Sequence, residues 1–416
     1  MASSAAKLQT SGEPNLSRAT SLVAIGIFAT TFAQPHFLGR LPLQNLLKNE
    51  LHVTRATNAA FFFWAGLAWY FKPIAGLLTD AFPLFGRRRA SYMATGALLG
   101  ALAWVALAYV PHEYKWMLLV CTIITVFMVL ASSALAAYMA EAAQALAGTG
   151  RLAAVRGFIE QTCLVIVGPV AGYLATAAFG WTAFSCAAFL LPLAPAAFLL
   201  MREERLPPSP ETVFSRAAGS IAAAGKSGLL WAAGGITLLF YIAPGLNTAI
   251  FYKQQNDLHL ATQTQGFLQL LSGAGGVVAA VMYGIFSARF SFRSLLVSSL
   301  IFGTLADLGY LFYTTVTHAQ MIEGFNGFGY TLAELALLDL TLRAAPRGSE
   351  GLGMAILLSL KTLATFGTDW LGAQLLDVWH LTFHSLVLSN AFTTLLTVPA
   401  ALLLCRRTRG RLFSRG

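Results

Sequence analysis

The hydrophobic pattern of this chain consists of long apolar runs separated by short polar segments. A helix needs about 20 predominantly apolar residues to cross the hydrocarbon core of a bilayer. The uncharged stretch 161–201 is long enough for two such helices, joined near Gly180–Trp181. The pattern therefore predicts an all-α integral membrane protein with twelve transmembrane helices. The predicted spans are 19–44, 56–79, 90–110, 115–140, 152–177, 180–201, 228–251, 264–288, 294–313, 319–343, 351–377 and 382–405.

One long polar segment interrupts this pattern near the middle of the chain. Residues 202–227 contain three prolines and several charges, which indicates a linker between two bundles of six helices. The two halves echo each other, because Gly76–Arg89 after the second span and Tyr283–Arg293 after the eighth each begin at or next to a glycine and end in basic residues. The predicted organisation is an N-terminal tail at 1–18, a bundle at 19–201, the linker at 202–227, a second bundle at 228–405 and a basic tail at 406–416.

The basic residues predict the orientation of the helices. Most of the 27 Lys and Arg residues lie in segments on the same side as the N-terminus, including the triplet Arg87–Arg89. Loops rich in Lys and Arg stay in the cytoplasm. Both termini are therefore expected in the cytoplasm, with the polar start of the chain as a tail and not a signal peptide. The expected location is a plasma or inner membrane, in preference to a chloroplast envelope.

Composition excludes several other classes of protein. Hydrophobic residues make up 57% and charged residues 11% of the chain, whereas a soluble domain has about 25% charged residues. The net charge of +10 reflects the basic residues that set the topology, and these residues can also bind anionic lipids. They do not form a patch of the kind that binds nucleic acid.

The sequence contains no arrangement typical of a metal site or an enzyme. His380 and His384 are four residues apart, but no clear third ligand accompanies them. The four cysteines lie in apolar spans without metal or disulfide spacing, and we interpret them as packing residues. They are Cys121, Cys163, Cys186 and Cys405. We expect no metal, no cofactor and no catalytic residues.

Three stretches resemble the signature of the folate–biopterin transporter family. The first is Trp69–Arg89, WYFKPIAGLLTDAFPLFGRRR. The second runs from Pro244 through FYK at 251–253 to Arg293. The third is APRGSEG at 345–351, followed by a glycine-rich span that ends in LGA at 371–373. Together the matches extend over both halves of the chain.

This resemblance implies a transporter of the major facilitator superfamily, with two pseudo-symmetric six-helix bundles, alternating access and proton coupling. We expect proton-coupled uptake of a pterin-like, folate-like or related aromatic organic anion. The alternative is a carrier or exporter of another small organic solute, such as a nucleoside, an aromatic acid or a drug. The expected partners are the solute, protons and membrane lipids, and the expected state is a monomer.

Ionisable side chains inside the predicted spans are candidates for substrate or proton binding. Each costs about 2.5–3.5 kcal/mol in a lipid-facing helix, so it should face protein or water. Lys72 is such a residue in the second span, and Trp69 beside it is a candidate for stacking on an aromatic substrate. The alternative for Lys72 is a structural ammonium group that binds backbone carbonyls.

The tenth and eleventh spans contain a predicted ion pair. These spans are antiparallel neighbours, and Glu334 and Lys361 each lie about 14–15 Å from the cytoplasmic end, so they are expected to meet. Asp369 lies two turns beyond Lys361, which is too far for direct contact. It is either a coupling or substrate residue, or a solvated carboxylate of an outer vestibule.

Two further carboxylates leave similar alternatives. Arg156 and Glu160 are four residues apart in the fifth span and are expected to pair on one helix face, whereas the functional alternative makes Glu160 a proton site. Asp307 in the ninth span is interpreted as structural.

The cytoplasmic loops contain the predicted moving contacts. Asp80 and the triplet Arg87, Arg88 and Arg89 can bind helix ends and rim groups of the other half. By resemblance to the superfamily they form a latch, although the arginines alone could serve only topology. The predicted inner-rim gate comprises Glu141, Arg156, Asp339 and Arg343.

Small residues predict where the halves meet. Gly168 and Gly172 form a Gly-x-x-x-Gly in the fifth span, and Gly273, Gly275 and Gly276 cluster in the eighth. Small residues allow helix backbones to approach closely in a membrane. By resemblance to the superfamily, these two spans are expected to face each other.

Overall fold

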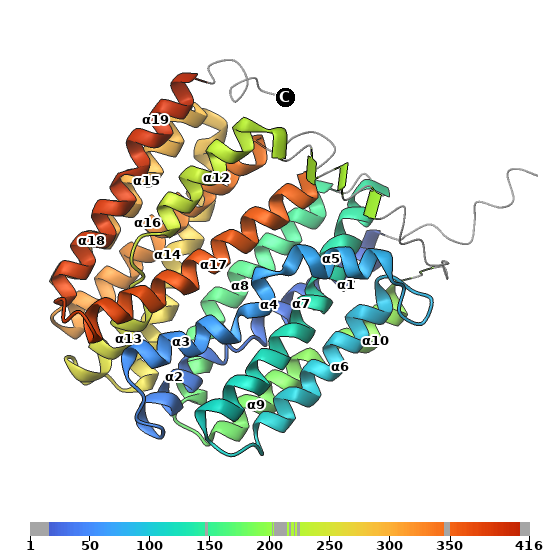
Figure 1. Cartoon of the computed structure of the whole chain (residues 1–416), viewed down its shortest axis with the longest axis horizontal. Coiled ribbons are helices and arrows are strands. Elements are labelled where there is room, and N and C mark those ends of the chain that lie inside the picture. Colours follow the sequence, from blue (N-terminus) through green and yellow to red (C-terminus); the bar gives the residue numbers. More distant parts are fainter. Residues whose placement is uncertain are drawn as a thin grey trace, which may run out of the picture.

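The computed structural model describes residues 16–145, 149–201, 203, 214–215, 218–219, 221–222, 225–344 and 350–407, and the described part contains helices and no strands (Figure 1). The expected latch residue Asp80 lies in a described helix, but its side chain is outside the described set.

The first half comprises α1 (Leu16–Phe32), α2 (Arg40–Asn49), α3 (Arg55–Ala65), α4 (Leu67–Tyr70), α5 (Lys72–Ala81), α6 (Ala90–Leu107), α7 (Tyr114–Ala145), α8 (Thr149–Leu174), α9 (Phe179–Leu190) and α10 (Leu193–Leu200).

The second half has a matching set of long helices. It comprises α12 (Gly228–Tyr241), α13 (Asn247–Asn256), α14 (Thr262–Arg289), α15 (Phe292–Leu308), the 3₁₀ helix η1 (Gly309–Phe312), α16 (Val316–Ala344), α17 (Glu350–Asp377), α18 (Phe383–Leu395) and α19 (Thr397–Arg407). The blue and green helices of the first half occupy one side of the molecule, and the yellow to red helices of the second half occupy the other (Figure 1).

Seven helical segments in the described part are long and apolar enough to cross a membrane. They are Ala90–Leu107, Tyr114–Met139, Val155–Leu174, Phe179–Leu200, Thr262–Ser287, Phe292–Phe312 and Phe383–Arg406. Several other expected spans are divided into shorter helices: 19–44 into α1 and α2, 56–79 into α3–α5, and 228–251 into α12 and α13.

The helix breaks are stabilised by polar groups of neighbouring helices. Trp104 on α6 donates its indole N–H to the carbonyl of Ala33 at 3.0 Å, in the break between α1 and α2. Between α12 and α13, the Gly245 N–H donates to the carbonyl of Thr368 at 2.8 Å, and the Asn390 amide donates to the carbonyl of Pro244 at 2.9 Å. Backbone groups inside a membrane need such partners, so the breaks are viable only because other helices cover them.

Each half has its own apolar core. One cluster of buried side chains is drawn almost entirely from α1–α10, and includes the fully buried Trp104, Phe61 and Phe62. Two other clusters lie within the second half. All four cysteines are buried, in keeping with a packing role.

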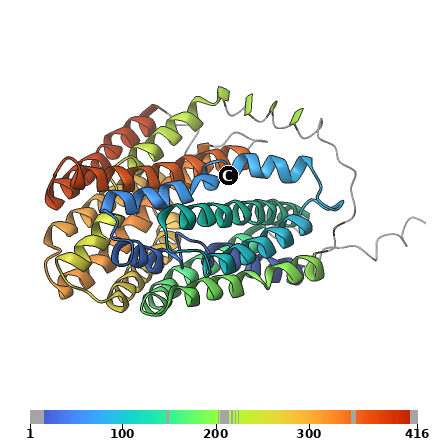
Figure 2. The same ribbon diagram turned by 60° about the horizontal axis from the view of Figure 1, so that its bottom comes forward.

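The halves meet along two lines of contact. α14 packs against α8, and we call this contact the glycine seam. α17 packs against α3, α4 and α5, as both views show (Figures 1 and 2), and also bonds to α2. We call the contact of α17 with α2–α5 the polar seam.

Backbone meets backbone in the glycine seam. A Cβ atom on Gly168 would collide with the Gly266 carbonyl oxygen and would lie 2.7 Å from the Leu270 nitrogen. A Cβ atom on Gly273 would lie 2.7 Å from the Leu164 carbonyl oxygen. The expected approach of the fifth and eighth spans is therefore present, and only glycine fits at these positions. Gly275 and Gly276, which were expected in the same contact, instead pack against α16 of their own half.

Candidate functional site

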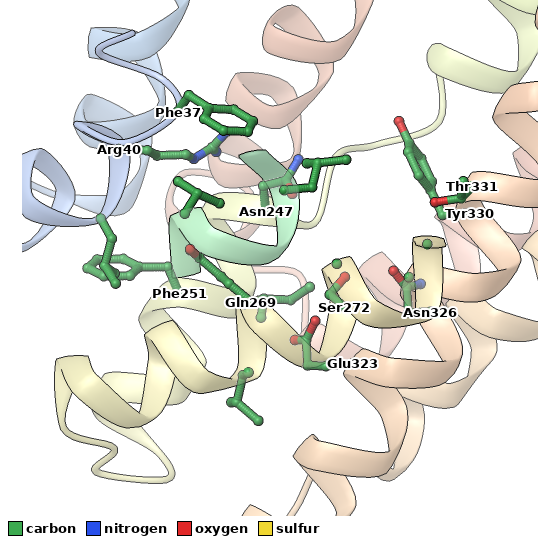
Figure 3. A pocket seen from close by; sticks show the side chains of 18 of the residues that line it. Phe37, Arg40, Asn247, Phe251, Gln269, Ser272, Glu323, Asn326, Tyr330 and Thr331 are labelled. Atoms are coloured by element: carbon green, nitrogen blue, oxygen red, sulfur yellow. The ribbon is translucent and has the colours of Figure 1, made fainter. Parts of the chain in front are cut away.

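A cavity of about 340 Å³ lies between the two halves. Phe37 and Arg40 approach it from the first half, whereas Asn247, Gln269 and the polar face of α16 approach it from the second (Figure 3). Its volume is at the lower end of the range of about 300–1,000 Å³ that is usual for small-molecule sites. A smaller cavity of about 110 Å³ adjoins it inside the second half, and both are lined by Asn326 and Tyr330.

A buried ion pair across the polar seam closes one side of this cavity. Arg40, at the start of α2, lines the cavity and places a guanidinium nitrogen 3.0 Å from Asp369 on α17. The Asp369 side chain is 2% exposed and that of Arg40 is 19% exposed. Thr248 on α13 donates both its backbone N–H, at 2.9 Å, and its hydroxyl, at 2.7 Å, to the same carboxylate.

The interpretation of Asp369 as a solvated vestibule carboxylate is therefore wrong. The structure surrounds this carboxylate with donors from α2 and α13, and burial without such partners would carry a large free-energy cost. Asp369 instead joins three helices, one of them from the other half.

More polar contacts between the halves lie at the same end of the molecule. Arg55 Nε lies 3.8 Å from the Asp377 carboxylate, which also accepts the Ala56 N–H at 2.8 Å. Lys48 donates to the side chain of Asn256 at 2.5 Å, and the Tyr252 hydroxyl donates to the carbonyl of Val53 at 2.9 Å. We call this end, where α2, α3 and α13 meet, the closed end.

The expected pair Glu334 and Lys361 forms an ion pair. Glu334 lines the large cavity from α16, and the Lys361 ammonium lies 5.1 Å from the centre of the Tyr241 ring. The side chains keep 35% and 27% exposure respectively. The structure thus places this pair at the edge of the cavity, with an aromatic ring beside the ammonium group.

A second group of charges lies on the first half. Lys72 donates to the Ser132 hydroxyl at 3.1 Å and lies 4.8 Å from the centre of the Trp69 ring. The expected intrahelical pair of Arg156 and Glu160 is present at 2.9 Å. Glu160 interacts electrostatically with Lys72 and also with Lys361 of the other half.

These five charged side chains form one group, which we call the charged cluster: Lys72, Arg156, Glu160, Glu334 and Lys361. Lys72 is bound to a hydroxyl, and not to the backbone carbonyls that the structural interpretation required. Trp69 reaches the cavity only indirectly, because its ring packs edge-on against His36, a lining residue.

The loop between α5 and α6 is fixed by a residue that the sequence pattern does not single out. The carboxylate of Glu203 accepts the backbone N–H groups of Arg88, Arg89 and Ala90 at 2.7–3.1 Å, so it caps the start of α6. An acidic group at a helix N-terminus is favourable because of the helix dipole.

Two side chains of the arginine triplet contact their own half in this structure. Arg89 pairs with Glu141 on α7 at 2.6 Å, and the Arg87 guanidinium lies 5.4 Å from the centre of the Phe198 ring. On the second half, Arg343 pairs with Asp339 at 2.8 Å within α16. Contacts within a half are thus made by Arg87, Arg89 and the four predicted gate residues, at the end of the molecule opposite the closed end.

Sequence reasoning missed several polar residues that line the cavities. The sequence pattern singles out neither Arg40 nor Glu323 on α16, although both line the large cavity. Asp307 on α15, which was interpreted from the sequence as structural, lines the smaller cavity, where it is buried and accepts a hydrogen bond from Asn326 at 3.2 Å. The available signal was the spacing of Glu323, Asn326 and Tyr330 along one face of α16.

Comparison with known proteins supports the sequence resemblance. The BT1 family profile matches residues 35–409. A folate-biopterin transporter from Synechocystis sp. is 26% identical, with 92% of this chain and 82% of that protein covered. The probable folate-biopterin transporter 2 of Arabidopsis thaliana is also 26% identical, with 83% of this chain and 73% of that protein covered.

The fold is similar to that of solved major facilitator transporters. A D-xylose-proton symporter superposes with a TM-score of 0.70 at 16% identity, over 94% of this chain and 97% of its own. The nucleoside transporter NupG gives a TM-score of 0.70 at 12% identity, over 93% of this chain and 99% of its own. At these identities the likeness concerns the fold alone. The family profile covers most of the sequence, and the chain belongs to the BT1 family of transporters.

Proposed function

We propose that this protein takes up a pterin-like, folate-like or related aromatic organic anion together with protons, by alternating access. The proposal includes twelve membrane spans in two bundles. The protein lies in a plasma or inner membrane, with both termini in the cytoplasm. The relatives named as folate-biopterin transporters support the substrate class.

One observation carries the proposal: a cavity between the halves is lined by a cationic side chain and by aromatic rings. Arg40 supplies a planar guanidinium that suits a carboxylate or a ring carbonyl. Phe37 and Phe251 line the same cavity, and aromatic rings favour stacking with a flat heterocycle. An organic anion with an aromatic ring matches both features.

The distribution of contacts supports an alternating-access cycle. In our proposal the closed end faces outward, so the structure corresponds to an inward-facing state. Opening to the outside requires that Arg40 leave Asp369, and a bound anion offers Arg40 a replacement partner. Movement of this kind couples substrate binding to a conformational change through differential affinity for the two states.

The charged cluster and the loop charges have separate roles in this proposal. Lys72, Glu160, Glu334 and Lys361 form the substrate and proton pathway on the inner side of the cavity, with Trp69 beside them. Asp80 and Arg87–Arg89 form the latch, and Glu141, Arg156, Asp339 and Arg343 the gate, when the inner ends of the halves come together in the outward-facing state.

Thermal stability of the purified protein tests the substrate class. A ligand that binds the folded state raises its apparent stability. We expect stabilisation by folic acid or biopterin, and weaker or no stabilisation by nucleosides and simple aromatic acids. Stabilisation by nucleosides alone would contradict the proposed substrate.

A matched pair of arginine variants tests the role of the cavity. Arg40→Lys keeps a positive charge opposite Asp369 but removes the planar fork, so we expect weaker binding of the stabilising compound. Arg55→Lys makes the same change at the closed end, outside the cavity lining, and should bind that compound like the wild type. Equal loss of binding in both variants would contradict the role given to Arg40.

A further inference from the structure

The wall of the large cavity contains a carboxyl group whose described partners are all neutral. Glu323 on α16 is 8% exposed. Its Oε1 accepts a hydrogen bond from the Tyr313 hydroxyl at 2.9 Å, and its Oε2 accepts one from the Tyr310 hydroxyl at 3.4 Å. Gln254 on α13 donates to the Tyr313 hydroxyl oxygen at 2.7 Å and lies 3.5 Å from Oε1. Figure 3 shows Glu323 among the polar residues that surround the cavity.

The charged groups on the surrounding helices have partners of their own. On α13, Lys253 pairs with Asp257 at 2.9 Å, and on α2, Arg40 pairs with Asp369 at 3.0 Å. Along α16, His318 bonds to Thr314 and Glu334 pairs with Lys361. From α15, Asp307 bonds to Asn326. The other titratable groups that face Glu323 are Tyr310 and Tyr313, and within the described residues no cation forms an ion pair with it.

This environment suits a carboxyl group that changes its protonation state. An ionised carboxylate buried without a cation is costly, and protonation removes that cost. The two tyrosine hydroxyls stabilise the ionised form by hydrogen bonding. The balance between the two forms therefore depends on hydration, which differs between a cavity that is open to water and one that is closed.

The other cavity and cluster carboxylates are less suited to hold the coupling proton through the conformational change. Glu334 and Glu160 have basic partners in contact, and Asp369 is held by Arg40 and Thr248. Asp307 lines only the smaller cavity. Glu323 alone among these five lines the large cavity without a basic partner in the described part of the chain.

We infer that Glu323, held by Tyr310 and Tyr313, is the group that binds and releases the coupling proton. The inference rests on the proposed proton-coupled uptake. Protonation from the outer side, near the closed end, would precede the change to the inward-facing state, and release would follow once water reaches the cavity from the inner side.

A first experiment needs no substrate. Infrared titration of the full-length protein in liposomes should reveal a protonated-carboxyl signal that varies with pH. We expect Glu323→Gln to remove one component of this signal. Tyr313→Phe removes a donor to the ionised form, so it should move the midpoint of the same component to higher pH by about one to two units. Asp307→Asn should retain the component that Tyr313→Phe moves. An unchanged signal in Glu323→Gln overturns the inference.

A second experiment tests coupling in proteoliposomes with labelled folic acid and biopterin. An inwardly directed proton gradient should accelerate uptake by the wild type. In Glu323→Gln this acceleration should be lost, and the exchange of labelled for unlabelled compound that persists should no longer vary with pH. Wild-type acceleration in the variant overturns the inference but leaves the proposed function intact.

The remaining outcomes separate the two proposals. If the gradient has no effect on the wild type, the proposed proton coupling fails and the role of Glu323 fails with it. If the variant unfolds at the wild-type temperature but neither binds nor exchanges the compounds, Glu323 recognises substrate and does not carry the proton. If neither compound is transported by the wild type, the proposed substrate class fails, and the infrared titration still decides whether Glu323 titrates.

Discussion

The two seams between the halves are built from opposite kinds of residue. In the glycine seam, α8 and α14 touch through backbone atoms at Gly168, Gly266 and Gly273. Among the side chains that the structure describes, no ion pair or hydrogen bond joins these two helices. In the polar seam, α17 contacts the first half through the Arg40–Asp369 pair and through the tilted ring pair of Phe63 and Trp370.

This difference separates permanent contact from contact that can be broken. Close packing of backbones depends on shape, so any added atom disturbs it, and no alternative partner can replace it. An ion pair can be exchanged for water or for a substrate group. We therefore interpret the glycine seam as the pivot of the molecule and the polar seam as the part that opens.

The largest expected effect comes from adding a side chain to the glycine seam. Gly168→Leu would place side-chain carbon atoms where backbone atoms of α14 already lie. We therefore expect no folded protein in the membrane. Size-exclusion chromatography of a fluorescent fusion measures this directly. Gly157→Ala on the same helix is the control, because nothing lies within 4 Å of the point that a Cβ atom would occupy there. Normal yield and thermal stability of Gly168→Leu would contradict the close contact.

A smaller effect is expected for the buried ion pair of the polar seam. Asp369→Ala leaves Arg40 without its carboxylate, and we expect a loss of about 3 kcal/mol, the low end for broken buried pairs because Arg40 keeps some exposure. Thermal unfolding in detergent provides the measurement. The double variant Arg40→Gln with Asp369→Asn removes both charges and should recover part of the loss. If the double variant is the less stable of the two, the pair is not the source of the effect.

The smallest effect is expected at the exposed edge of the same seam. Arg55 and Asp377 are separated by 3.8 Å and are 25% and 23% exposed. Arg55→Gln should cost less than about 1 kcal/mol, because exposed pairs contribute little. The difference from the wild type should shrink further in high salt. A loss as large as that of Asp369→Ala would show that burial does not distinguish the two pairs.

Sequence reasoning succeeded where the relevant contacts are local in sequence. The Arg156–Glu160 pair follows from helical periodicity, and it is present. The contact of Glu334 with Lys361 follows from two antiparallel helices joined by a short loop. In each case, helix geometry alone fixes which side chains are neighbours.

It failed where the contact depends on how the halves dock. Arg40 and Asp369 are 329 positions apart, and no repeat or spacing relates them. The helix breaks were also missed, because an apolar run has the same composition whether the helix is continuous or divided. Their hydrogen-bond partners, such as Trp104 for Ala33, lie on other helices.

Glu323 shows a third kind of failure. It lies near the start of α16, where a carboxylate in a sequence looks like part of a solvated helix end. Its burial results from Tyr310 and Tyr313, which precede α16, and from Gln254 on α13. Only the tertiary structure brings these groups to one point.

The glycine seam has a consequence for how this protein can evolve. A substitution at Gly168 has no compensating substitution opposite it, because Gly266 is already the smallest residue available. Ion pairs can be inverted or relocated by two successive changes, whereas this contact offers no second step. Natural variation and directed evolution should therefore remodel the substrate cavity and the charges around it while leaving the pivot as it is.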